Sequence, residues 1–142
     1  MKKLFKYFCV CLAFVNILTI LSGCRAAYYY SYDDLKSEVI KVEVIKIDDL
    51  GRNQVLLREL SGKEIDMMLI ELAQIRFSYP FGDPLEVHGF CFKIYYRSLK
   101  YEIIGQMGTK RFDEDNRSVA WYKRRCSVAD FKTLISKFVD IE

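Results

Sequence analysis

Alternation of apolar and charged residues over residues 38–48 (EVIKVEVIKID) is the feature that most restricts what this chain can fold into. Ile40, Val42 and Val44 alternate with charged side chains. A period of two in β-branched residues predicts a strand with one buried face. Turn residues follow at 48–53 (DDLGRN), and residues 54–60 (QVLLREL) are predicted to form a second strand. The short connection favours a hairpin.

Three further strands are predicted in the second half of the chain. Residues 86–98 are rich in aromatic and β-branched side chains, and Phe90, Phe92, Ile94 and Tyr96 share one face of the expected strand. The other two strands are expected at 101–108 and 119–126.

Two amphipathic helices are predicted, each behind a capping pattern. The first is predicted to begin at a capping box formed by Ser61 and Glu64. In a capping box the serine oxygen and the glutamate carboxylate each accept a hydrogen bond from a backbone amide. Its apolar residues recur at helical spacing over about 15 residues, and the Met67–Met68 pair is expected to fill the core. The second helix follows Ser127. The two apolar stripes are Ile65, Met68, Leu69, Leu72 and Ile75, and Phe131, Leu134, Ile135 and Phe138.

The order of these elements defines the expected fold class. A further capping pattern, Ser31 with Asp34, predicts only a short helical turn over 32–37. The order is therefore β-β-α-β-β-β-α, with strands joined by hairpins. It predicts a two-layer α+β domain in which an antiparallel sheet of about five strands carries two helices on one face.

The first 24 residues have a different character from the rest. Lys2, Lys3 and Lys6 form a positive head, and residues 7–21 are almost entirely apolar. Small residues follow, as in a secretory signal. The apolar stretch is shorter than the roughly 18 residues that a membrane-spanning helix needs. We therefore expect residues 1–23 to be a removable signal peptide.

The end of this signal, Leu21-Ser22-Gly23-Cys24, resembles the lipobox of bacterial lipoprotein precursors. The resemblance covers only the first 24 residues. It implies cleavage between Gly23 and Cys24 and attachment of a diacylglycerol lipid to the Cys24 thiol. It also implies a location in the cell envelope, tethered to a membrane on its extracytoplasmic side. The mature domain resembles small bacterial surface lipoproteins only loosely.

The expected division of the chain follows from this cleavage. Residues 24–31 are expected to be the lipidated cysteine and a tether, and residues 32–142 a single α+β domain. Tyrosines occur in and beside the tether. They either lie at the membrane interface, where a ring with a polar tip is favoured, or begin the fold and pack on it. These tyrosines are Tyr28, Tyr29, Tyr30 and Tyr32.

Charge excludes nucleic acid as the expected partner. The full chain has 22 basic and 19 acidic residues, and removing the three signal lysines leaves 19 of each. A neutral domain lacks the positive surface on which nucleic-acid binding depends. The expected partners are the membrane, through the lipid on Cys24, and a protein of unknown identity.

Two cysteines remain for the domain, because Cys9 and Cys11 leave with the signal and Cys24 takes the lipid. Cys91 and Cys126 both fall in predicted strands. Outside the cytoplasm they either form a disulfide, which requires adjacent strands and matched faces, or stay as two buried thiols.

No residue pattern predicts catalysis, a metal or a cofactor. The single histidine, His88, is three residues from Cys91, so along a strand the two side chains point to opposite faces. Zinc and calcium sites need clustered ligands that this sequence does not supply. Glu102, Asp113 and Glu114 have no spacing that favours paired catalytic carboxylates.

Surface aromatic residues are the remaining functional signal. Tyr95, Tyr101, Trp121 and Tyr122 fall on predicted strands, with lysine and arginine between them. On an uncovered sheet face they would form a protein-interaction surface; alternatively they complete a small core. We therefore expect a binding module and not an enzyme. The alternative is binding of a glycan or peptide near the loop from Pro80 to Pro84, and an enzyme is a further alternative.

Overall fold

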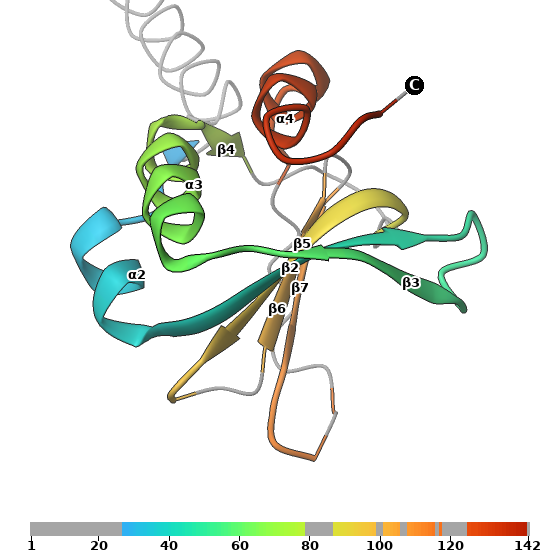
Figure 1. Ribbon diagram of the computed structural model, residues 1–142, viewed down its shortest axis with the longest axis horizontal. Coiled ribbons are helices and arrows are strands. Elements are labelled where there is room, and N and C mark those ends of the chain that lie inside the picture. The colour runs from blue at the N-terminus through green and yellow to red at the C-terminus, as the bar shows by residue number, and fades with distance from the viewer. Residues whose placement is uncertain are drawn as a thin grey trace, which may run out of the picture.

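The computed structural model describes residues 27–78, 87–98, 101–105, 108–115, 117 and 125–141 (Figure 1). Within these ranges the chain is a mixed α+β protein with an open, five-stranded antiparallel sheet and three helices. No helix in this described part is both long and apolar enough to cross a membrane.

The five strands are ordered β3-β2-β5-β6-β7, and every neighbouring pair is antiparallel. A separate two-stranded sheet pairs β1 with β4. The strands are β1 (Ala27–Tyr28), β2 (Val39–Ile47), β3 (Gln54–Glu59), β4 (Phe77–Ser78), β5 (Gly89–Tyr96), β6 (Tyr101–Gly105) and β7 (Gly108–Phe112). The helices are α2 (Tyr32–Glu38), α3 (Gly62–Gln74) and α4 (Val128–Ile135).

The alternating segment forms β2, which lies between β3 and β5. Val42 and Val44 are fully buried, as their period of two predicts. Ile40 differs and is exposed. The register with β5 shifts between Val39 and Lys41, and this irregularity takes Ile40 out of the alternation that buries the two valines.

All three capping patterns begin helices. The Ser31 hydroxyl oxygen accepts a hydrogen bond from the Asp34 amide at the start of α2. At α3 the Ser61 amide donates to the Glu64 carboxylate at 2.9 Å. This bond is the largest influence on the pKa of Glu64, which is lowered. Ser127 caps α4. The sequence prediction of two helices therefore missed one, because the turn predicted over 32–37 is the full helix α2.

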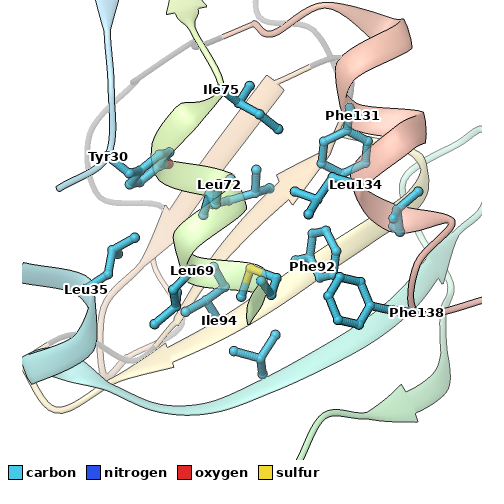
Figure 2. Packing of buried hydrophobic residues seen from close by; sticks show 14 of the residues in the cluster. Tyr30, Leu35, Leu69, Leu72, Ile75, Phe92, Ile94, Phe131, Leu134 and Phe138 are labelled. Carbon is cyan, nitrogen blue, oxygen red and sulfur yellow. The ribbon is translucent and has the colours of Figure 1, made fainter. Parts of the chain in front are cut away.

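The main core lies between the helices and one face of the five-stranded sheet, as Figure 2 shows. Phe92 of β5 lies edge-on to two rings from the C-terminal region, with ring centroids 5.9 Å from Phe131 and 5.7 Å from Phe138. Edge-to-face aromatic pairs stabilise by about 0.5–1.5 kcal/mol beyond the area that they bury. Met68 fills this core, whereas its neighbour Met67 is exposed, contrary to the expectation that both fill it.

A buried carboxylate completes this core at one end. Glu102 of β6 is fully buried. Its Oε1 accepts a hydrogen bond from the Tyr30 hydroxyl at 2.7 Å, and its Oε2 accepts one from the Tyr96 hydroxyl at 3.0 Å. The Arg111 Nε lies 3.2 Å from Oε2. We call these four residues the Glu102 cluster.

In the Glu102 cluster the negative charge of Glu102 is balanced by the positive charge of Arg111. Burial raises the pKa of the Tyr96 hydroxyl far above its usual range, and the neighbouring Glu102 charge raises it further. Burial by itself would lower the pKa of Arg111. The attraction to the Glu102 charge, together with smaller effects, outweighs burial, so the pKa of Arg111 is raised. At neutral pH Tyr96 therefore stays a hydrogen-bond donor, and Arg111 stays positively charged beside Glu102. A buried carboxylate without such partners would be strongly destabilising.

Residues 27–31 belong to the fold and are not a free tether. Ala27 and Tyr28 pair with β4, and Tyr30 is buried. The Tyr30 ring lies edge-on to Tyr28 and to Phe77, with both centroid distances 5.2 Å. Of the two alternatives for these tyrosines, packing on the domain therefore holds for Tyr28 and Tyr30.

The fifth strand of the sheet is β7, which differs from the prediction of a strand over 119–126. Residues 119–124 of that prediction lie outside the described residues, and Arg125 forms a single bridge with Ser78 of β4. The sequence of β7, GTKRF, has no apolar alternation. It pairs with β6 over its full length, and its Arg111 lies directly opposite Glu102.

The Glu102 cluster predicts a selective loss of stability when one hydroxyl is removed. Tyr30→Phe deletes a hydrogen bond to a charged, buried acceptor, which contributes about 1.5–3 kcal/mol. We expect the free energy of unfolding, measured by urea denaturation, to fall by about 2 kcal/mol.

Tyr32→Phe is the matched control for this substitution. Its hydroxyl accepts a hydrogen bond from Lys36 at an exposed position, so its removal is expected to change the free energy of unfolding by less than about 0.5 kcal/mol. Equal losses in the two variants would contradict the role assigned to the Glu102 cluster.

Candidate functional site

The second face of the five-stranded sheet carries a row of aromatic rings. Phe92 and Ile94 of β5 point into the main core, so Tyr95 and its alternate neighbours lie on the other face. Tyr95 is directly opposite Tyr101 in the register, and Tyr101 is directly opposite Phe112. The ring centroids lie 5.8 Å and 4.5 Å apart, and the second pair is stacked. The register of three strands thus brings Tyr95, Tyr101 and Phe112 into one aromatic row.

Lysine side chains lie over this aromatic row. The Lys93 Nζ is 4.4 Å from the centroid of Tyr101, and the Lys110 Nζ is 5.4 Å from that of Phe112. The Lys41 Nζ is 5.6 Å from the centroid of Tyr95. An ammonium group held over an aromatic ring is attracted by the ring while its stem covers apolar surface. The second face is therefore a mixed aromatic and basic surface.

Glu43 connects the aromatic row to β2 and β3. It accepts a hydrogen bond from the Tyr95 hydroxyl at 2.8 Å, and its other oxygen lies 2.9 Å from the Lys41 Nζ. Lys41 also pairs with Glu59 of β3 at 2.9 Å. Burial raises the pKa of Tyr95 to about 12, and the Glu43 charge adds to the increase. Tyr95 therefore acts as a hydrogen-bond donor at neutral pH and not as a base.

Tyr95 and Tyr101, two of the four residues predicted for an interaction face, lie together but are not equally accessible. Tyr95 is half-buried, whereas Tyr101 is only 8% exposed. Tyr101 packs with a second apolar cluster that includes Ile45, Ile103 and Cys91. Tyr101 therefore completes a small core, and Tyr95 lies at its margin. Trp121 and Tyr122 lie outside the described residues.

The most exposed apolar surface belongs instead to strand β3. All six of its residues are exposed, and the exposed fractions are 58% for Val55, 56% for Leu56 and 41% for Leu57. β3 is the terminal strand of the sheet order, with β2 on its one paired side. We call Gln54–Glu59 the β3 edge. Such an apolar, open edge strand is a surface on which another strand can pair.

The hydrogen-bond pattern shows which backbone groups of the β3 edge point away from the sheet. The Asp48 amide donates to the Asn53 carbonyl, and the register then continues to Ile45 opposite Leu56. Because hydrogen-bonded and non-hydrogen-bonded pairs alternate in an antiparallel ladder, the amide and carbonyl groups of Gln54 and Leu56 face outward. The β3 edge therefore offers donors and acceptors beside its exposed side chains.

Sequence reasoning missed the β3 edge and the Glu102 cluster for the same reason. A strand was predicted at 54–60, but its place in the sheet depends on long-range pairing that a single sequence does not contain. The run Val55-Leu56-Leu57 was the available signal, because it breaks the alternation expected of a half-buried strand. The register of β3 with β2 shifts in this run, between the partners of Val44 and Ile45.

The remaining candidate residues are not brought together. His88 Nδ1 lies 3.9 Å from an oxygen of Asp49, whose side chain is almost fully exposed, so the pair is on the surface. Within the described ranges, no group of three His, Cys, Asp or Glu residues is arranged to hold a metal ion. The Pro80 to Pro84 loop lies outside the described residues.

The two cysteines are free and buried, and they belong to two different apolar clusters. Cys91 belongs to the second apolar cluster, and Cys126 belongs to the main core. Of the two alternatives for this pair, the structure has two separate thiols. Gly105 leaves the space that Cys91 fills, since a Cβ at Gly105 would lie 2.9 Å from the Cys91 Sγ.

Comparisons with protein-family models, curated proteins and solved structures found no match for this chain.

The burial of the two cysteines predicts low thiol reactivity. Burial raises the pKa of Cys91 to about 12 and is the main cause that raises that of Cys126 to about 11. Against an ordinary thiol pKa of about 8.5, the thiolate fraction at pH 8 is lower by at least about two orders of magnitude. A chain of residues 25–142, which contains only these two cysteines, should label with iodoacetamide far more slowly when folded than in urea. Rapid labelling of the folded chain, or a mass showing a disulfide, would contradict this.

Proposed function

We propose that this protein is a lipid-anchored binding module that holds a protein partner at the extracytoplasmic surface of a bacterial membrane. The β3 edge is the observation that carries the binding part of the proposal. Three successive apolar side chains are exposed there beside outward-facing amides. The resemblance of Leu21 to Cys24 to a lipobox supports the anchor and the location.

The proposed partner contributes an extended segment that pairs with the β3 edge. Strand addition obtains affinity from main-chain hydrogen bonds and specificity from pockets and side chains beside the strand. Leu56 is opposite Ile45, which lies on the second face, so a partner paired there also approaches the margin of the aromatic row. Protein interfaces favour tyrosine with apolar neighbours, and this composition supports a protein as the partner.

The anchor is tested by the intact mass of the protein from its own membranes. We expect a chain that begins at Cys24 and carries a diacylglycerol lipid. A Cys24→Ser variant, which lacks the modified thiol, should carry no lipid. A wild-type chain that lacks residues 1–23 but carries no lipid on Cys24 would contradict the anchor.

The binding surface is tested by crosslinking the tagged, lipidated protein in its membranes and identifying captured proteins by mass spectrometry. Leu56→Lys places a charge at the centre of the β3 edge, where lysine is well tolerated by an exposed strand. We expect capture of the partner to fall at least about tenfold, as for a residue that dominates an interface.

Ile70→Lys is the matched control, because Ile70 is an apolar residue of α3 with a similar exposure. Both variants should keep the wild-type free energy of unfolding within about 0.5 kcal/mol, since they change exposed side chains. Capture that is unchanged in Leu56→Lys, or that falls equally in both variants, would rule out the β3 edge as the binding surface.

A further inference from the structure

The proposed lipid site and the first strand are very close in the sequence. Three residue steps separate Cys24 from Ala27, where β1 begins. A fully extended chain covers at most about 3.5 Å per residue, so β1 starts within about 10 Å of a lipid-bearing Cys24. This inference rests on the proposed lipidation. If Cys24 carries the lipid, β1 is held next to the membrane surface.

β1 is also firmly joined to the domain. Its two residues pair with Phe77 and Ser78 of β4. Two residues further on, the Tyr30 hydroxyl donates to the buried Glu102 carboxylate. A short link on one side and this packing on the other leave the domain little freedom to turn away from the membrane. The outward-facing side of the β1–β4 sheet is therefore expected to lie next to the membrane.

The alternation of β4 identifies that outward side. Phe77 is fully buried, so Ser78 and Arg76 on either side of it point the other way. Ser78 is directly opposite Ala27 and Arg125 in the two neighbouring segments, and directly opposite residues share a face. Continuing the register of β1 with β4 places Tyr29, which is half-exposed, opposite Arg76. We call this surface the anchor-side face; it consists of Ala27, Tyr29, Arg76, Ser78 and Arg125.

The chemistry of the anchor-side face fits anionic lipid headgroups. Tyrosine is favoured at the membrane interface, because its ring is apolar and its hydroxyl is polar. Arginine forms strong, paired hydrogen bonds with phosphate. Among the described residues, neither Arg76 nor Arg125 forms a salt bridge.

We propose that the anchor-side face rests on the phosphate groups of the bilayer that holds the Cys24 lipid. The lipid supplies the attachment, and the face fixes the orientation of the domain. Figure 1 shows β4 near the end of α3, whereas the hairpin of β2 and β3 projects in another direction. In this orientation the β3 edge remains open to a partner.

The test places a nitroxide label on the mature, lipidated protein in vesicles of phosphatidylcholine and phosphatidylglycerol. The label is attached at Tyr29→Cys on the anchor-side face or, as the control, at Leu50→Cys in the exposed β2–β3 turn. The native Cys91 and Cys126 are buried, and the unsubstituted protein measures their background labelling. Collisions of the label with a water-soluble nickel reagent measure its exposure to water.

We expect collisions at position 29 to fall severalfold on the vesicles, with no change at position 50. Equal collision rates at the two positions in a protein that floats with the vesicles would overturn the orientation while leaving the anchor intact. A protein without lipid by mass, which does not float with the vesicles, would overturn the anchor and with it this inference.

Charge reversal tests the role of the two arginines. Combining Arg76→Glu with Arg125→Glu should remove the protection at position 29. Each arginine near an anionic membrane surface strengthens the association with that surface by about fivefold. Combining Arg52→Glu with Arg97→Glu is the matched control, since both residues are exposed and lie outside the anchor-side face. Loss of protection in both double variants, or in neither, would contradict recognition by this face.

Discussion

Glu102 holds two tyrosine hydroxyls and one arginine at one point inside the protein, and Tyr30 lies 72 positions away from it in the sequence. Tyr30 precedes the first described helix, Tyr96 ends β5, and Arg111 lies on the terminal strand β7. A buried carboxylate is strongly destabilising without its partners, so these segments are stable only when they are assembled together. Glu102 therefore couples the position of β1 to that of β7. This explains why β7 forms a strand without an apolar alternation.

The same constraint separates the two ends of the molecule. Tyr30 fixes β1 beside β4 at the C-terminal end of α3, while β3 leads into the N-terminal end of α3 (Figure 1). Thirteen residues of helix span about 20 Å. The proposed attachment near β1 and the proposed binding strand β3 are therefore held apart by a rigid helix. A partner on the β3 edge would not compete with the surface that we propose to face the membrane.

Local features of the fold follow from the sequence, whereas its long-range features do not. The period of two predicted β2, and the capping patterns predicted where the helices begin, because both signals depend on neighbouring residues. The sheet order and the Glu102 cluster depend on contacts across as many as 72 positions, as between Tyr30 and Glu102. The sequence predicted that Tyr95 and Tyr101 lie on strands, but the burial of Tyr101 depends on packing with Ile45 of β2 and Cys91 of β5.

The β3 edge is protected at one end only. Arg58 contacts Glu64 and donates to the Phe138 carbonyl, so charge and side-chain bonding occupy the end near α3. The register shift beside Leu57 interrupts the ladder there. Natural proteins use such charges and irregularities to prevent strand pairing. The part that lacks them, from Gln54 to Leu56, is long enough for only a short strand. Main-chain bonds alone would hold a partner weakly, so the proposed recognition also requires side-chain contacts with Val55 and Leu56, which project from opposite faces.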